Sequence, residues 1–415
     1  MKRSLYYIST LCSVLLLCQC TSMQTPGGPY LHSYSFAPGQ EDDIRKALIQ
    51  IEDSTEIQLA AGTYTFEKLS IKGKLTRVTL KGAGKEETIL DFSDQQSGGE
   101  GLRIDYVNDL TIEGLTLQES SGDLLKFTEC RGVLINDVGT VWAGEPDSAN
   151  GGYGIYPVLC HDVIIEHSYA RGASDAGIYV GQTVGAIVRH CKAEYNVAGI
   201  EIENTQNAEV YDNEASNNTG GLLIFDLPGL KYDGKNTVAR NNHIHDNNYR
   251  NFARASNSVS GVGNVPPGTG VMILRTSDLE LHNNRIENNN TMSLGILSYV
   301  TVDPTILQIR PDFDPIPKNV NIHDNTISKG EDFPEAAYKH HMAQTIIQLQ
   351  EGLVKGGSPV KSIPPILYDG IAFAEGQNPN NICIMQKESG FLNMDAGANF
   401  ANPDYDMTAY LCDAQ

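Results

Sequence analysis

The sequence predicts an all-β solenoid built from short, repeated rungs. Two adjoining segments of equal length, 176–197 and 198–219, both open with Ala-Gly-Ile and match again at several later positions. A period of about 22 residues that carries short β-type runs is typical of solenoids, in which each unit buries its apolar face against the next. The same period extends in both directions, with rung starts expected at Gly101, Asp123, Gly152, Ala176, Ala198, Gly220, Gly270 and Met292.

Each rung opens with a run of alternating side chains. Because successive side chains of a strand point to opposite faces, one set should line the interior and the other should point outward. The expected interior residues are Ile178, Val180, Ile200, Ile202, Leu222, Ile224, Val271 and Ile273. The expected outward residues are Tyr179, Glu201, Glu203, Leu223, Phe225 and Met272.

A second strand-like run follows the first by about ten residues in each rung. Aligning these runs gives one column, which reads Ser168, Cys191, Asn213, Asn242, Asn284 and Asn325. Stacked asparagine side chains form amide ladders, and asparagine tolerates the left-handed backbone of a sharp turn. The column resembles the asparagine ladder of right-handed parallel β-helices, so we expect a right-handed single-stranded parallel β-helix.

The N-terminus carries export signals. Residues 1–19 have a basic start and a short apolar core, which is typical of a secretory signal peptide. The run 17–22 looks like a bacterial lipobox with Cys20 as the acylated residue, and Cys18 is a competing choice. Thr21 and Ser22 do not resemble the aspartate signal for inner-membrane retention. We therefore expect an exported, lipid-anchored protein at the outer membrane or cell surface, with residues 20–40 as a tether.

The remaining chain divides into three parts. Residues 41–100 should form an N-terminal cap and the first rungs, beginning with a short amphipathic helix over 41–51. Residues 101–330 should form the regular β-helix. Residues 331–415 should form a helical insertion over 331–354 and a C-terminal cap, in which Cys383 and Cys412 either form a disulfide or remain separate, since sequence does not fix pairing.

The composition is acidic, with a formal net charge of −21. This charge argues against nucleic acid as a partner, because phosphates are neutralised by Lys and Arg. It favours solubility as its main role, with cation binding or a basic partner as the alternatives.

Two insertions, 140–151 and 247–269, fall just before the first strand of a rung and should lie on the same edge of the coil. A third insertion, 226–236, follows a first strand. Loops of a solenoid gather on one face and often form its binding site. The first two insertions would flank the outward face of rungs 152–220, which makes the 140–275 face a candidate groove.

The candidate catalytic residues are Tyr179, Glu201 and Glu203 on the floor of this groove and Asp226 at its margin. Glu201 and Glu203 are two residues apart on one strand, so they share a face at roughly 6.5–7 Å. Paired carboxylates suit acid–base work or glycosidic cleavage. With Asp226 they could equally hold Ca²⁺, a hard ion that takes several oxygen ligands. The competing interpretation is an ordinary solvated outer face.

Candidate substrate-binding residues surround this floor: Trp142, Tyr156, Asp175, Lys231 and Arg275. Trp and Tyr can stack on sugar rings, and Arg275 and Lys231 can pair either with uronate carboxylates or with neighbouring acidic side chains. A set of histidines follows the repeat period and is expected at exposed or stacking turn positions: His161, His167, His190, His243, His282 and His323.

Four segments carry a resemblance to a known family: 173–182, 193–204, 217–230 and 266–274. They are similar to exported bacterial parallel β-helix repeat proteins, whose members often accompany a second exported protein and for which no reaction is established. More distantly, the repeats resemble carbohydrate-binding and sugar-hydrolase β-helices, mannuronan epimerases and the copper-site accessory protein of nitrous oxide reductase. The chain has neither the Asp-Pro-His-Asp tetrad of the epimerases nor a recognisable copper-site pattern.

Two functions follow from these observations. The first is a polysaccharide-directed protein that binds its substrate, or processes it as a lyase, epimerase or glycoside hydrolase, in the 140–275 groove. The second is a non-catalytic surface or periplasmic scaffold that acts with a partner exported protein. Fold analogy alone does not choose between them.

Overall fold

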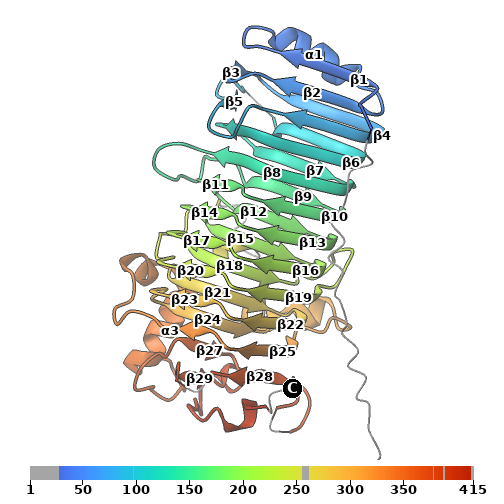
Figure 1. Cartoon of the computed structure of the whole chain (residues 1–415). Helices are drawn as coiled ribbons and strands as arrows, with labels where there is room; N and C mark the ends of the chain where they lie inside the picture. The colour runs from blue at the N-terminus through green and yellow to red at the C-terminus, as the bar shows by residue number, and fades with distance from the viewer. Residues whose placement is uncertain (1–27, 97, 255–260, 377, 387, 413–415) are drawn as a thin grey trace, which may run out of the picture.

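The computed structural model describes residues 28–96, 98–254, 261–376, 378–386 and 388–412. These residues wind into one continuous stack of parallel strands, with β1 and α1 at one end and β28 and β29 at the other (Figure 1). The predicted parallel solenoid is confirmed. The predicted signal peptide and Cys20 lie outside the described residues.

The pairing arranges the strands in three columns. The first column contains the starts of β4 (Leu69–Lys81) and β6 (Glu100–Gln118), then β7 (Asp123–Thr128), β9 (Tyr153–Val158), β12 (Ala176–Gly181), β15 (Ala198–Glu203), β18 (Gly220–Phe225), β21 (Thr269–Leu274), β24 (Met292–Leu297), β27 (Ile366–Tyr368) and β29 (Phe391–Asn393). The second contains β1 (His32–Phe36), β2 (Thr55–Leu59), the later part of β4, the middle of β6, the start of β8 (Arg131–Val141), β10 (His161–Glu166), β13 (Val184–Arg189), β16 (Gln206–Tyr211), β19 (Lys235–Arg240), β22 (Ser277–His282), β25 (Lys318–His323) and β28 (Ile382–Met385). The third contains β3 (Gly62–Thr65), β5 (Thr88–Asp91), the ends of β6 and β8, β11 (Tyr169–Arg171), β14 (Lys192–Glu194), β17 (Glu214–Ser216), β20 (His243–His245), β23 (Arg285–Glu287) and β26 (Thr326–Ile327).

Helices are few and lie at the edges of the coil. They are α1 (Glu41–Ile49), α2 (Ile306–Ile309) and α3 (His341–Glu351), with short 3₁₀ turns η2 (Val262–Asn264), η3 (Tyr299–Thr301), η4 (Glu335–Lys339), η5 (Ala396–Ala398) and η6 (Thr408–Tyr410). The helix predicted over 41–51 is confirmed as α1, whose Ile44 and Leu48 are buried in the core. The helix predicted over 331–354 is present as η4 and α3.

The interior is a single apolar core. All eight residues expected to point inward belong to it, and each is at most 2% exposed. Their alternation explains the fold, because a parallel coil buries one face of every strand against the next column.

The corners that follow the second column share one backbone conformation. Each strand of the second column from β10 to β25 is followed by a residue with positive φ, as at His190, Asp212 and Asn283, and then by the ladder residue. The predicted asparagine ladder is present, since the Nδ2 of Asn242 donates to Oδ1 of Asn284 at 2.9 Å and each neighbour repeats the bond. Cys191 occupies the same column, and its backbone N–H donates to Asn213 Oδ1 at 3.0 Å.

A second asparagine ladder was missed at the sequence level. It runs along the next corner through Asn196, Asn218, Asn247 and Asn289, with amide–amide bonds of 2.9–3.1 Å. The match of Asn196 with Asn218 in the two equal segments was its signal. Two ladders on neighbouring corners fix the register of successive rungs.

Both ends of the chain depart from expectation. Residues 32–36, expected in a tether, form β1 and pair in parallel with β2. Beyond residue 330 the coil continues, because β27 stacks on β24 and β28 stacks on β25. Cys383 and Cys412 form a disulfide, with their Cα atoms 5.7 Å apart. Within the described residues, no helix has the length and apolar character needed to cross a membrane.

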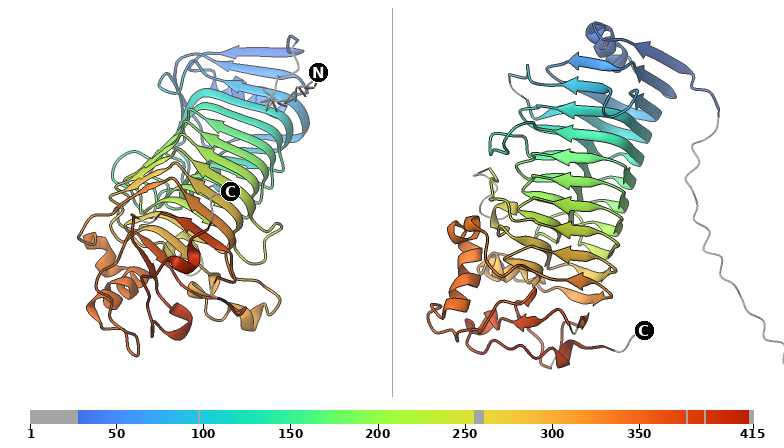
Figure 2. Two further views of the ribbon diagram at one scale, coloured as in Figure 1. Left: turned by 60° about the horizontal axis from the view of Figure 1, so that its bottom comes forward. Right: turned by 60° about the vertical axis from the view of Figure 1, so that its left-hand side comes forward.

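The insertions gather beside the first column. Residues 142–152, 246–268 and 328–365 leave the corner that precedes it, and residues 226–234, 298–317 and 369–381 leave the corner that follows it. Figure 2 shows α3 and its flanking segments alongside the C-terminal half of the stack. The outward face of the first column therefore lies between two sets of loops, and we call it the groove face.

Candidate functional site

The groove face changes chemistry along its length. From β18 onward its outward side chains are apolar, as at Leu223, Phe225, Met272 and Leu297. They form a second buried cluster with Phe252, Val262 and Val265 of one insertion and Ile346 and Leu349 of α3. This half is closed over by protein because its apolar surface is stabilised when it is covered.

The N-terminal half of the groove face carries tyrosines and acids instead. Tyr153 and Tyr156 of β9 lie with their ring centroids 4.2 Å apart, and both are half-buried. Tyr179 of β12 is buried and lies 4.8 Å from Tyr153 and 4.9 Å from Tyr156, edge-on to the latter. We call these three residues, with Asp175, Glu201 and Glu203, the acid–tyrosine cluster.

A glycine explains how Tyr179 reaches Glu203. The hydroxyl of Tyr179 donates a 2.6 Å hydrogen bond to Oε1 of Glu203. The ring crosses Gly181, where an added Cβ would lie 2.1 Å from the phenol oxygen. Since Gly181 pairs in register with Glu203, the space above this glycine is the route from Tyr179 to the carboxylate.

The carboxyl groups of the cluster are held away from water. Glu201 is 2% exposed and Glu203 is 9% exposed. Burial, reinforced by the charges of Asp175 and Glu203, raises the pKa of Glu201 well above its ordinary value. Burial also raises the pKa of Glu203, against the lowering effect of the Tyr179 hydrogen bond. The Oε2 atom of Glu201 is buried without a hydrogen-bond partner, which is costly and marks it as a functional candidate.

The expected open groove floor is therefore wrong at these positions. Tyr179, Glu201 and Glu203 point outward as predicted, but they are covered rather than solvated. Two insertions beside this face also contact each other: the Tyr249 hydroxyl donates to Glu145, and the Arg250 guanidinium donates to the carbonyl of Pro146 at 2.6 Å. The two insertions lie on one edge, as predicted, but they contact each other.

Asp226 stands apart from the two glutamates. Its position follows Phe225, so it aligns with the corner residue Asn204, whose Nδ2 donates to it. Arg275 forms ion pairs with Asp226 and, at 2.9 Å, with Asp233. Burial raises the pKa of Asp226 to about 7, while the Arg275 guanidinium opposes the shift. Arg275 thus pairs with neighbouring acids, the alternative that the sequence left open.

Glu201, Glu203 and Asp226, the alternative calcium ligands, do not form one cluster. Across the described ranges, no three His, Cys, Asp or Glu side chains converge in a way that could hold a metal ion. The two glutamates still share one face of β15, as the alternation predicted.

The other predicted binding residues divide between inside and outside. Trp142 is 3% exposed, and its indole N–H donates to the carbonyl of Ser120 at 2.7 Å, so it supports the corner rather than a ligand. Asp175 is buried within the acid–tyrosine cluster. Lys231 is exposed, with its ammonium 4.8 Å from the centre of the Tyr232 ring. Tyr156 is the predicted binding residue that lies on the accessible part of the groove face.

Three residues beside Tyr156 escaped the sequence analysis. Lys126 of β7 places its ammonium 4.4 Å from the centre of the Tyr156 ring and 3.7 Å from a carboxylate oxygen of Asp123. Burial raises the pKa of Asp123 to about 6, against the opposing charge of Lys126. Tyr153 is the third. The register of β7 with β9, which pairs Lys126 with Tyr156, was the signal that could have found them.

Four of the six periodic histidines stack on one another, as expected. His167 stacks on His190 at 5.2 Å and His282 on His323 at 5.1 Å, along the corner of the second column. His243 lies on the outward face of the third column, stacked 3.8 Å from His245.

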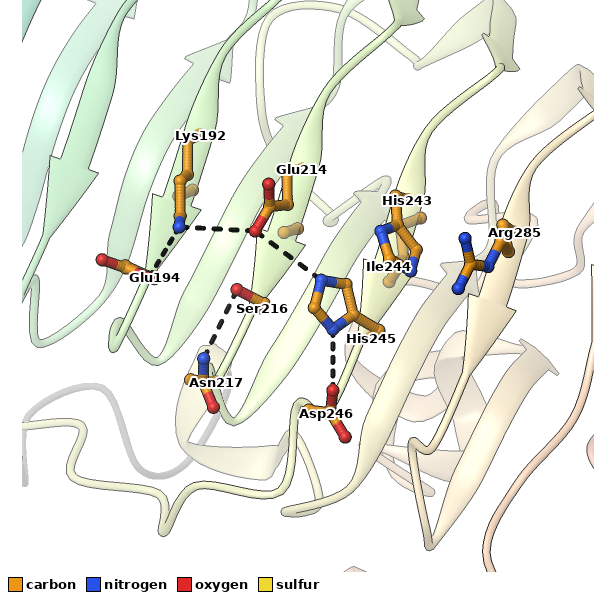
Figure 3. Close-up of polar contacts among 12 residues, drawn as sticks. Lys192, Glu194, Glu214, Ser216, Asn217, His243, Ile244, His245, Asp246 and Arg285 are labelled. Carbon is orange, nitrogen blue, oxygen red and sulfur yellow. Dashed lines mark hydrogen bonds and ion pairs between the residues drawn. The ribbon is translucent and has the colours of Figure 1, made fainter.

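The third column also carries an extended ion-pair chain, shown in Figure 3. Lys192 lies 3.2 Å from Glu194 and 3.4 Å from Glu214, and His245 joins Glu214 at 3.7 Å and Asp246 at 2.7 Å. Each of these side chains has a polar partner within the row, and the Lys192–Glu214 and His245–Glu214 contacts link neighbouring rungs.

Comparison with known proteins agrees with the observed fold. Residues 100–301 match the family model described as right handed beta helix region. This stretch of the chain is a right-handed β-helix. No protein of curated function matches the chain in sequence.

Solved structures share the fold at low identity. The A-module of the Azotobacter vinelandii mannuronan C-5 epimerase AlgE4 is 16% identical, with a TM-score of 0.52 over 81% of this chain and 91% of that one. The A-module of AlgE6 from the same organism is 16% identical, with a TM-score of 0.43 over 70% and 83%. An alginate lyase of Paenibacillus is 15% identical, with a TM-score of 0.40 over 71% and 95%. The likeness to the AlgE4 A-module, at 16% identity, concerns the fold alone.

Proposed function

We propose that this protein binds polysaccharide on the groove face at β7 and β9. The observation that carries the proposal is the half-buried pair Tyr153 and Tyr156, packed against Tyr179 and flanked by Lys126 and Asp123. Tyrosine offers an apolar ring for the face of a sugar and a hydroxyl for its polar edge. Lys126 and Asp123 add a donor and an acceptor, the convergent polar groups that orient a ligand.

The acids behind the tyrosines support this surface. Glu203 accepts the hydrogen bond from Tyr179, and Tyr179 packs edge-on against Tyr156. A rigid aromatic surface loses little conformational entropy on binding. The fold shared with the AlgE4 A-module, a mannuronan epimerase by name, supports polysaccharide as the ligand class.

Replacing Tyr156 by alanine should lower polysaccharide affinity by about tenfold or more, since a stacked aromatic is lost from the centre of the surface. The measurement is affinity gel electrophoresis or calorimetry of the mature chain on a panel of acidic and neutral polysaccharides. The matched control is Tyr106→Ala, because Tyr106 is a 49% exposed tyrosine elsewhere on the coil. Equal affinity for wild type and Tyr156→Ala would move the binding surface away from β9.

A second candidate function is processing of the bound chain, and Glu201 is the observation that favours it. Its unpartnered Oε2 atom and raised pKa are what a general acid needs at neutral pH. Processing requires that Glu201, which is 2% exposed, become accessible to the substrate. The reaction classes are those of a lyase, an epimerase or a glycoside hydrolase.

Processing is tested by NMR of polysaccharides incubated with the protein, with and without Ca²⁺. Cleaved chains, unsaturated ends or epimerised residues that disappear in Glu201→Gln would establish an enzyme and place its acid. If the polysaccharide is unchanged but binds to the wild-type protein with an affinity that depends on Tyr156, binding alone would be the function. Absence of both would favour the scaffold that acts with a partner exported protein.

Export and lipid anchoring at Cys20 belong to the same proposal. The expected observation is a lipid-modified N-terminal peptide beginning at Cys20, detected by mass spectrometry of the membrane-associated protein. Cys20→Ser should release the protein from the membrane, while Cys18→Ser should not. The reverse pattern would assign the anchor to Cys18.

A further inference from the structure

A second feature of the groove face lies at its C-terminal end. A cavity of about 460 Å³ opens between β24, α3 and the segment that contains η3 and α2. We call it the apolar cavity, and its principal lining residues are Met292, Leu297, Leu307, Met342, Ile346 and Met394. Its volume falls within the range of small-molecule sites.

The lining offers almost nothing to a polar ligand. Its only polar side chains, among the residues that the structure describes, are Thr301 and Thr345. The hydroxyl of Thr301 donates to Asp369 at 2.8 Å, and that of Thr345 donates to the carbonyl of His341 at 3.4 Å. A polar group entering the cavity would give up hydrogen bonds to water without replacing them. The occupant must therefore be apolar within the cavity.

The shape of the lining suits a flexible chain. Met292, Met342 and Met394 approach from β24, α3 and the segment after β29. Methionine side chains are unbranched and adapt to irregular contents, so this wall can follow the bends of an aliphatic chain.

The rim of the cavity combines exposed apolar surface with a positive charge. Phe373 lines the cavity and is 63% exposed. The backbone of Lys355 lies close to the lining residue Phe400, because its carbonyl accepts a 2.8 Å hydrogen bond from Nδ2 of Asn399, the residue before Phe400. Lys355 is exposed, and no described carboxylate lies within ion-pair distance of its ammonium. An anionic head group would complement this charge.

We propose that the apolar cavity binds a fatty acid, with its aliphatic chain inside and its carboxylate at Lys355. The aliphatic chain follows from the lining, and the carboxylate follows from the rim. The proposal is independent of polysaccharide binding at β9, since no residue of the acid–tyrosine cluster lines the cavity.

Calorimetry of the delipidated protein with laurate and with dodecanol tests this site. Wild type should bind both, and Thr345→Trp should lower both affinities by about tenfold or more, because the indole fills the entrance. The matched control is Gln348→Trp on the solvent side of α3, which should bind like wild type. Lys355→Gln should weaken laurate binding and leave dodecanol binding unchanged.

Three outcomes would overturn the proposal. No binding of either compound to wild type would exclude an aliphatic occupant and leave the cavity to a side chain of a partner protein. If Thr345→Trp and Gln348→Trp lower the affinities equally, or if neither lowers them, the aliphatic chain binds elsewhere. Laurate binding unaffected by Lys355→Gln would remove the head-group assignment.

Discussion

Replacing Glu201 by glutamine should make the protein more stable at neutral pH, and the gain should disappear in acid. The carboxyl is 2% exposed, lies beside Asp175 and Glu203, and has one oxygen without a partner. An unsatisfied buried polar group costs about 1–3 kcal/mol, and more when it is charged. Burial raises the pKa of this carboxyl, so folding at neutral pH must either protonate it or bury its charge. The neutral amide avoids both costs while keeping the shape of the side chain.

The sign of the pH dependence follows from the raised pKa of Glu201. In the unfolded chain a glutamate titrates near its ordinary pKa of about 4.3. In the folded protein burial raises this pKa, so between the two values the native state holds a proton that the unfolded state has released. Wild-type stability therefore falls as pH rises through this window, and below it both states are protonated and the penalty is absent.

The measurement is the midpoint of thermal unfolding of both proteins from pH 4 to pH 8. Glu201→Gln should unfold several degrees higher at pH 8 and together with wild type at pH 4. The control is Glu209→Gln on β16, an exposed glutamate 3.5 Å from Arg240, whose midpoint should change little at any pH. A lower midpoint for Glu201→Gln at pH 8 would show that the ionised carboxylate is stabilised by its surroundings.

Most of the coil could be predicted from the repeat itself. The alternation around Ile200 and Ile202 decides which side chains face inward, because a one-residue shift would expose every apolar group. The Asn213–Asn242 ladder follows equally from local spacing. Such features depend on one rung and its neighbours, which the sequence aligns directly.

The candidate site could not be predicted in the same way. Sequence alternation correctly turned Glu201 and Tyr179 outward, yet both are buried. Tyr179 belongs to an apolar cluster with Phe252 and Val262, which come from an insertion tens of residues later in the chain. Trp142, the single tryptophan of the sequence, was predicted to bind substrate because it lies in an insertion that should flank the groove. Its indole N–H instead donates to the carbonyl of Ser120. Long-range cover of this kind leaves no periodic signal.

The asparagine ladder gives the second large expected effect. Asn242 accepts hydrogen bonds from the backbone N–H and side-chain amide of Asn213. It donates to the carbonyl of Val210 and to Asn284, both at 2.9 Å. Asn242→Ala would leave several buried groups unpaired and should destabilise the coil by about 3 kcal/mol or more.

Chemical denaturation measures this loss, and hydrogen exchange locates it. Protection should fall first in the rungs around β16, β19 and β22, because each rung of a solenoid is stabilised mainly by its neighbours. The control is Asn108→Ala, at an exposed asparagine of β6 outside both ladders. If Asn242→Ala is as stable as the wild-type protein, the backbone pairing alone fixes the register of the rungs.

The converse substitution extends the ladder by one step. Cys191 stacks directly below Asn213, and its backbone N–H already donates to the amide oxygen of that residue. An asparagine at this position can donate to Asn213 as Asn213 donates to Asn242, so Cys191→Asn should gain up to about 1 kcal/mol. Since the thiol is buried, with weak contacts to the carbonyls of Ile165 and Arg189, little is lost. If the free energy of unfolding rises in Cys191→Asn and falls in Asn242→Ala, the hydrogen-bonded amide column itself stabilises the coil. If it falls in both variants, steric fit at the corner dominates.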